Sequence, residues 1–263
     1  MLIALKGVRY PDRARMEAAI NGALAWLAAM QNRDGGWGAF DRDNDCAILT
    51  QVPFADHNAM IDPSSADVTA RVLECFAYFG QTTDDSLVAR GLEYLRREQA
   101  PDGSWYGRWG VNYIYGTSGV MRAADVLKIG SSAWCQRAAA WLRTIQNRDG
   151  GFGETCASYA DPAKKGRGPS TPSQSAWAII GLLSGGHATD PAVVRAIEYL
   201  LDSQDGSGAW GEEATTGTGF PQVFYLKYHL YRQSFPLSAL ARYRALVDAR
   251  VPIGRQGETS IVC

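Results

Sequence analysis

Apolar residues recur at steps of three and four along two sets of segments, a spacing typical of helices with one buried face. In the first set, Ala, Leu, Arg and Glu add helix propensity; these segments span 16–30, 87–98, 133–145 and 193–203. The second set is more apolar and richer in small residues, as helices packed on several sides are; these segments span 66–79, 117–129, 173–183 and 220–231. The sets alternate along the chain, which predicts hairpins of one outer and one inner helix. No alternation of strand length competes with this prediction.

The end of each predicted outer helix carries one motif at a fixed spacing. An aromatic residue and Leu are followed by Gln five positions after the aromatic, and a second aromatic stands six positions later. The copies are Trp26–Leu27–Gln31–Trp37, Tyr94–Leu95–Gln99–Trp105, Trp141–Leu142–Gln146–Phe152 and Tyr199–Leu200–Gln204–Trp210. A turn with Asp and Gly follows each Gln, and Gly readily takes the left-handed conformation that ends helices. A repeat of this kind predicts one quasi-repetitive body, an all-α α/α toroid.

We interpret this motif as structural. The glutamines can satisfy free backbone groups at a neighbouring helix end; they are Gln31, Gln99, Gln146 and Gln204. The second aromatics can stack over the turn; they are Trp37, Trp105, Phe152 and Trp210. Together they would tie neighbouring outer helices at one edge of the toroid. Catalytic residues need not recur regularly, so we expect the chemistry to lie between the copies.

The charge balance argues against a nucleic-acid partner. The chain has 26 basic and 27 acidic residues and a net charge of −1, which leaves no basic footprint. Its five cysteines are scattered without a CxxC pair, which indicates reduced thiols and a cytoplasmic protein. No apolar stretch reaches the roughly eighteen residues that span a bilayer. Peripheral contact with the inner face of the cell membrane stays open, because it needs only an exposed apolar patch.

Two patterns that suggest a metal site do not hold. Segment 41–45 begins like a calcium loop, but Cys46 stands where that loop needs Gly, and Val52 where it needs Glu. The histidines are too dispersed for a zinc site; they are His57, His187 and His229. We therefore expect no metal, and we interpret each histidine as a surface or structural residue.

The repeat resembles the QW repeat of triterpene cyclases, and longer segments resemble bacterial squalene–hopene cyclases. These segments are QNRDGGWGAFDRDND, PFADHNAM, DGSWYGRWGVNYIYGT, GRGPSTPSQSAWAIIGLL and TGTGFPQVFYLKYHLYR. The resemblance runs from Met1 to about Arg242, which implies a C-terminal α/α-barrel domain at 1–242, an incomplete α6/α6 barrel, and a tail at 243–263. It also implies cationic cyclisation of squalene or a similar polyprene to hopene or hopanol in hopanoid biosynthesis, with no metal or organic cofactor.

A reaction through carbocations needs a dry cavity with electron-rich ring faces, each of which stabilises a cation by up to about 2 kcal/mol when desolvated. Phe220 and Phe224 are four apart, so their rings share a face if the segment is helical, and Tyr228 continues that face. An aromatic stripe in a core would show the same spacing. The resemblance favours the cavity for these three residues and also for Trp109 and Phe40.

Asp67 and Arg71 are one helical turn apart, a spacing that permits an ion pair. Residue spacing alone is equally consistent with an exposed surface pair of little energetic value. The resemblance implies that both belong to a polar cluster around the catalytic acid, and that Tyr115 lies near it. Some family members have His where this chain has Arg71. An arginine does not release its proton, so we expect Arg71 to orient the acid.

The family's protonating acid is the middle Asp of Asp-x-Asp-Asp-Thr-Ala, and this string does not occur in the chain. The opening MLIALK resembles the helix that follows the motif in the family. We therefore expect a chain that begins just after the acid, lacks the first hairpins of its barrel, is inactive alone and pairs with the N-terminal half of a cyclase. Two alternatives are a non-catalytic α/α-toroid module that binds an isoprenoid, and part of a cyclase for another polyprene.

Overall fold

The computed structural model describes residues 2–51 and 60–249, and these residues are mostly helical. His57 and the end of the predicted tail, 250–263, lie outside the described residues. The α-helices are α1 (Leu2–Leu5), α2 (Arg13–Ala29), α3 (Ala66–Tyr78), α4 (Ser86–Arg97), α5 (Tyr113–Val126), α6 (Ala133–Thr144), α7 (Pro172–Ser184), α8 (Pro191–Asp202) and α9 (Tyr231–Asp248). Short 3-10 helices are η1 (Ala47–Gln51), η3 (Cys156–Tyr159) and η4 (Pro162–Lys164), and the strands are β1 (Gly217–Phe220) and β2 (Phe224–Leu226).

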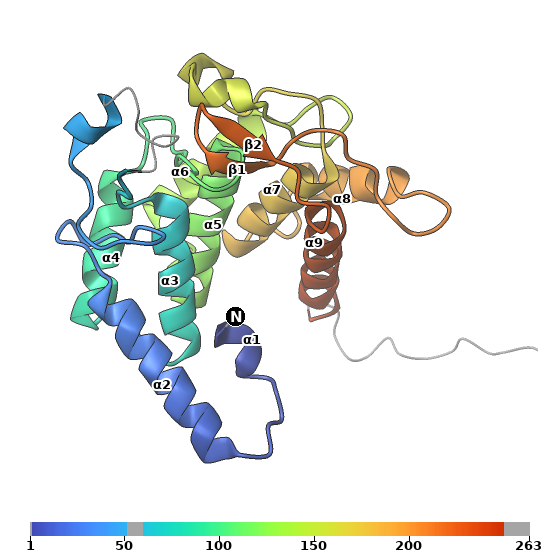
Figure 1. The fold of residues 1–263 in the computed structure, drawn as a ribbon. Coiled ribbons are helices and arrows are strands. Elements are labelled where there is room, and N and C mark those ends of the chain that lie inside the picture. The colour runs from blue at the N-terminus through green and yellow to red at the C-terminus, as the bar shows by residue number, and fades with distance from the viewer. Residues whose placement is uncertain (1, 52–59, 250–263) are drawn as a thin grey trace, which may run out of the picture.

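Outer and inner helices alternate along the chain, as the sequence predicts. The inner helices α3, α5, α7 and α9 pack side by side in chain order, and Figure 1 shows them as one curved layer. The outer helices α4, α6 and α8 each pack on the inner helix that precedes them in the chain, namely α3, α5 and α7. Every residue of α7 is buried, because this helix has neighbours on several sides. The predicted all-α toroid is confirmed.

Each motif turn is attached to its inner helix by one recurring hydrogen bond. The backbone N–H of the second aromatic donates to a hydroxyl in the first turns of the next inner helix. The pairs are Trp37 with Thr69 at 3.0 Å, Trp105 with Thr117 at 2.9 Å, and Phe152 with Ser175 at 2.8 Å. In the fourth copy Gln233 of α9 takes this place and accepts from the Trp210 N–H at 3.4 Å. α9 is therefore the fourth inner helix.

The glutamines of the motif join neighbouring outer helices. Each of the first three donates from Nε2 to a carbonyl of its own turn and to a carbonyl in the first turn of the next outer helix. The second acceptors are Leu87 of α4 at 2.9 Å, Trp134 of α6 at 2.8 Å and Ala192 of α8 at 2.8 Å. The indole N–H groups donate back to the outer helix: Trp37 to Leu27, Trp105 to Leu95 and Trp210 to Leu200, at 2.7–2.8 Å.

The predicted helix over 220–231 is wrong. Residues 217–226 form the antiparallel hairpin β1–β2, a turn follows, and α9 begins only at Tyr231, so the segment holds the end of β1, all of β2 and the first residue of α9. Pro221 disfavours helical dihedrals for Phe220, and Gly217 and Gly219 are poor helix formers. The face shared by Phe220 and Phe224 is therefore not a helix face. Separately, α5 begins four residues before the predicted 117, and the predicted domain end at 242 falls within α9.

Candidate active-site cavity

A cavity of about 730 Å³ lies against the inner helices α3, α5, α7 and α9. Leu2 and Ile3 of α1 and Leu27 of α2 complete its apolar wall. Four of the predicted site residues line it, namely Asp67, Arg71, Trp109 and Tyr115. Phe40, Phe220, Phe224 and Tyr228 are not among its lining residues. The structure therefore brings the predicted polar residues and one predicted aromatic together at the cavity wall.

Phe40 and Phe220 flank the cavity through ring contacts with Trp109. Phe40 meets Trp109 edge to face at a centroid distance of 5.6 Å, and Phe220 meets it at 5.9 Å. Phe224 extends this series with a centroid 5.8 Å from that of Phe220. Phe40 is 65% exposed and Phe224 38%, so the outer members of the series remain open to solvent. A continuous set of rings thus starts at the cavity and leads out of it.

A second aromatic cluster lies on the α7–α9 side of the cavity. Trp177 contacts Tyr115 at a centroid distance of 4.8 Å and Phe235 at 5.3 Å, and all three line the cavity. Tyr231 packs against Trp177 and Phe235 at 5.8 and 5.0 Å. Tyr228 joins the cluster through a ring contact with Tyr231 at 4.8 Å. Trp177 and Phe235 were not predicted, because the apolar surroundings of Trp177 in sequence indicate an ordinary helix core and Phe235 lies beyond the last predicted helix, which ends at 231.

The hairpin β1–β2 is attached to the loop that carries Trp109. Gly217 forms a bridge with Gly110, and the Thr218 N–H donates to the Trp109 carbonyl at 3.4 Å. The Tyr159 hydroxyl lies 2.7 Å from Thr218 Oγ1 and 2.8 Å from the Gly110 carbonyl. Phe220 therefore reaches Trp109 through strand pairing between distant segments and not through helical spacing.

The polar side of the cavity contains two charged residues, Glu74 and Arg122, in addition to those predicted from the sequence. Glu74, 3% exposed, accepts from Arg122 Nε at 2.5 Å, and its other oxygen lies 3.5 Å from Arg71 Nη1. Arg122 also donates to the Tyr78 hydroxyl at 3.0 Å. Glu74 and Arg122 line the cavity and were not predicted. The i, i+4, i+7 spacing of 67, 71 and 74 could have shown Glu74, whereas Arg122 comes from another helix.

The pKa values of Tyr115, Arg71 and Cys75 at the cavity wall are all raised above their ordinary values. Burial raises the pKa of Tyr115, although Arg71 opposes that shift, so the phenol stays protonated at neutral pH. Burial alone would lower the pKa of Arg71, but Tyr115 and Glu74 raise it above its ordinary value. Burial also raises the pKa of the Cys75 thiol in the cavity wall. The wall therefore presents a fixed cation and neutral phenol and thiol groups.

Phe40 is held by a buried carboxylate. Asp62, 4% exposed, accepts from the backbone N–H of Phe40 and from that of Asp41, the latter at 2.9 Å. The residues that follow fold onto the first motif turn: Asp43 lies 3.5 Å from both Arg33 Nε and Arg42 Nε. Segment 41–45 thus anchors the Phe40 loop.

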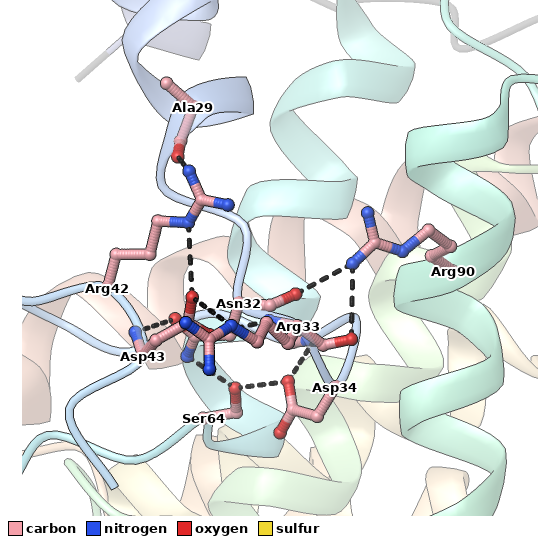
Figure 2. A network of polar contacts seen from close by, with 9 residues as sticks. Ala29, Asn32, Arg33, Asp34, Arg42, Asp43, Ser64 and Arg90 are labelled. Carbon is pink, nitrogen blue, oxygen red and sulfur yellow. Dashed lines mark hydrogen bonds and ion pairs between the residues drawn. The ribbon is translucent and has the colours of Figure 1, made fainter.

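The same network joins the first motif turn to α2, to α4 and to Ser64 just before α3. Figure 2 shows Arg42 reaching the Ala29 carbonyl at 3.0 Å and Arg90 of α4 reaching the Asn32 carbonyl at 2.9 Å. Ser64 donates to Asp34 at 2.8 Å. These contacts attach the Phe40 loop to the edge of the toroid that carries the motif turns.

Within residues 2–51 and 60–249, no three His, Cys, Asp or Glu side chains gather in a way that could hold a metal ion. Over the same residues, no helix combines the length and apolarity needed to cross a membrane. His187 bonds Arg143 near the α7–α8 turn, and His229 is exposed.

Comparisons with known proteins agree with this geometry. A family model described as the squalene-hopene cyclase C-terminal domain matches residues 1–245. The squalene–hopene cyclase of Zymomonas mobilis is 48% identical over 237 residues, which cover 89% of this chain and 36% of that protein. The squalene–hopene cyclase of Alicyclobacillus acidocaldarius is 47% identical over 248 residues, which cover 94% of this chain and 39% of that protein. The chain thus spans less than half the length of these relatives.

A solved structure shows the same fold at low sequence identity. The type II terpene cyclase MstE from Scytonema superposes with a TM-score of 0.56 at 19% identity, covering 90% of this chain and 69% of the other. This likeness concerns the fold alone.

Proposed function

Because the chain belongs to the squalene-hopene cyclase C-terminal domain family, we propose that it supplies the aromatic cavity wall of a cyclase that converts squalene, or a similar polyprene, to hopene or hopanol in hopanoid biosynthesis. The observation that carries the proposal is the series of rings Phe40, Trp109 and Phe220 beside a cavity of about 730 Å³. Desolvated ring faces attract cations. Trp109 lines the cavity together with Tyr115, Trp177 and Phe235, so more than one ring is available there as charge moves along the substrate.

The polar cluster would serve the opposite end of the reaction, where an alkene is protonated. Arg71 keeps 46% of its side chain exposed beside the cavity, where it contacts Glu74 at 3.5 Å and hydrogen-bonds Tyr115, so its remaining N–H groups can orient a carboxyl group that enters the cavity. It cannot itself release a proton. Tyr115 stays protonated, so it offers no phenolate that would trap a carbocation.

The proposed partner is the remaining part of a cyclase polypeptide, because the chain covers 36–39% of the two relatives' length. Peripheral contact with the inner face of the cell membrane and a cytoplasmic location are part of the same proposal. Exposed apolar side chains support that contact: Ile48 is 69% exposed, Leu230 76% and Leu237 58%. Flotation with anionic phospholipid vesicles tests it, and a chain that stays at the bottom of the gradient contradicts it.

One assay tests the cyclase proposal. The purified chain is incubated with squalene alone and together with the part of the Zymomonas mobilis enzyme that lies outside the matched region. We expect hopene or hopanol, detected by mass spectrometry, only from the mixture. Trp109→Ala should reduce the yield strongly, and Tyr10→Ala, an exposed tyrosine 43% open to solvent, should leave it unchanged. A chain that binds squalene but forms no product in the mixture would instead be a non-catalytic binding module.

A further inference from the structure

The junctions between consecutive outer helices share a two-way contact. In one direction, the motif glutamine donates to the carbonyl of the second residue of the next outer helix, as Gln99 does to Trp134 and Gln146 to Ala192. In the other direction, an arginine of that next helix returns a bond: Arg137 donates to Gln99 Oε1 and Arg195 to Gln146 Oε1. Each arginine stands four positions before its own motif aromatic.

The first junction is a variant of the same contact. Gln31 Nε2 donates to the Leu87 carbonyl at 2.9 Å, and Arg90, at the matching position of α4, donates to the Asn32 carbonyl at 2.9 Å. Each closed junction therefore uses one glutamine and one returning arginine. This regularity defines what a further outer helix must offer in order to continue the series.

The last motif, which contains Gln204, has no hydrogen bond to a further outer helix within the part of the chain that the structure describes. Among the described residues, Gln204 Nε2 donates only to Gly208 of its own turn, at 2.7 Å, and Oε1 accepts no hydrogen bond. Leu201 stands where α6 has Arg143, two positions after the motif aromatic. Arg143 contacts Asp190 at 2.6 Å, and Asp190 precedes the next outer helix. Leu201 therefore occupies the position whose side chain contacts the segment before the following outer helix at the α6–α8 junction, and in α8 this side chain is 54% exposed.

We propose that this edge of α8, defined by Val194, Leu201 and Gln204, is a docking surface for one more helical hairpin of the same repeat, from the remaining part of the cyclase polypeptide. Val194 is 36% exposed and lies seven residues before Leu201, so the two share a helix face. The partner's outer helix offers a first-turn carbonyl to Gln204 Nε2, an arginine to Gln204 Oε1 and apolar side chains to Leu201. The inference rests on the pairing proposed above and continues an interface that the chain already contains.

A second copy of this chain fits this edge less well. Its free outer helix is α2, and Gly22 occupies the position at which α4, α6 and α8 carry Arg90, Arg137 and Arg195. α2 therefore cannot return the bond to Gln204 Oε1. The remaining part of a cyclase is the occupant that the contact pattern favours.

The test measures binding of the chain to the unmatched part of the Zymomonas mobilis cyclase by titration calorimetry without squalene. We expect Gln204→Ala and Leu201→Arg each to weaken binding about tenfold or more, the loss that corresponds to one good polar contact. Gln51→Ala, an exposed glutamine of η1, is the matched control and should leave the affinity unchanged. Thermal unfolding of the chain alone should hardly change in Gln204→Ala but should fall clearly in Gln146→Ala, whose glutamine closes a junction.

Unchanged affinity in both Gln204→Ala and Leu201→Arg overturns the inference, as does an absence of binding by the unmodified chain. Self-association that Gln204→Ala abolishes also overturns it, because the occupant would then be a second copy. The proposed cyclase activity is judged separately. Hopene formed by a mixture whose affinity does not depend on Gln204 refutes the docking surface alone, and Gln204-dependent binding without product refutes the activity alone.

Discussion

The carboxylate of Asp67 accepts a hydrogen bond from the backbone N–H of Trp109 at 2.8 Å, across 42 positions of sequence. Asp67 lies in the first turn of α3 and is 3% exposed, so an inner helix holds the loop that carries the aromatic ring at the cavity. Arg71 and Glu74 continue the same face of α3. One buried carboxylate thus connects the polar side of the cavity with its aromatic side.

We expect Asp67→Ala to lower the free energy of unfolding by about 1.5–3 kcal/mol, because hydrogen bonds to charged groups contribute about this much. Trp109 should also lose its fixed environment. Asp67→Asn keeps an acceptor oxygen and should lose clearly less. Urea unfolding measures the stability, and near-UV circular dichroism reports on the tryptophan. Equal losses in the two variants would show that the bond to Trp109 is not what Asp67 contributes.

The indole N–H of the repeat aromatics should contribute measurably to stability. Trp105 is fully buried, and its Nε1 donates to the Leu95 carbonyl at 2.7 Å. Trp105→Phe leaves that carbonyl without its donor, and we expect a loss of about 1–3 kcal/mol in urea unfolding. Phe152 fills the matching position of the third copy, so the fold itself should persist.

Trp26→Phe is the matched control for that substitution. Trp26 is 57% exposed, and surface substitutions usually change stability by less than about 0.5 kcal/mol. If both tryptophan variants lose the same amount, ring size and not the hydrogen bond would determine the stability.

The sequence predicts most helices because their contacts follow the repeat. The predicted 66–79, 87–98, 133–145 and 173–183 differ by about one residue at each end from α3, α4, α6 and α7. The prediction fails at 220–231, where aromatics four apart suit both a helix and a hairpin. The hairpin is favoured by Pro221 and by pairing with Gly110, a contact across more than a hundred positions that no local window contains.

The cavity residues, too, could be predicted only where the evidence for them lies in one stretch of sequence. Trp109 could be identified because it lies in a segment that carries the family resemblance, and Asp67 and Arg71 because they are one helical turn apart within the region over which the resemblance runs. Arg122 could not, because its ion pair with Glu74 joins two inner helices 48 positions apart. Side chains that meet across helices become visible only once the helices are placed.

The hairpin should be sensitive to a single added methyl group. A Cβ at Gly219 would lie 1.9 Å from Cε2 of Phe224, so the ring or the strand must move. Overpacking of this kind costs about 1–3 kcal/mol, and we expect Gly219→Ala to lose that much in urea unfolding and to weaken the contact between Phe220 and Trp109. At Gly211 an added Cβ has no atom within 4 Å, so Gly211→Ala should change little. Similar behaviour of the two variants would contradict the hairpin geometry.

His187 should make the stability depend on pH. Arg143 Nη2 lies 3.0 Å from His187 Nδ1, and an arginine can only donate, so Nδ1 must be the unprotonated acceptor. Burial and then Arg143 lower the pKa of His187, with Asp190 partly opposing them. The unfolded chain therefore binds more protons than the folded chain as pH falls through about 6.5, and stability is lost there. The loss should stay well below about 1.4 kcal/mol per pH unit, because the ring is partly exposed and water screens it.

His187→Gln separates this effect from other titrating groups. Glu154 has a pKa raised by burial and should change stability in the opposite direction as pH falls, but it contributes equally to both proteins. The difference in free energy of unfolding between the parent chain and His187→Gln should therefore shrink from pH 7.5 to below about pH 6, the range in which an unperturbed histidine takes up its proton. A difference that stays constant over that range would mean that His187 takes up its proton equally in the folded and the unfolded chain, which the contact with Arg143 disfavours.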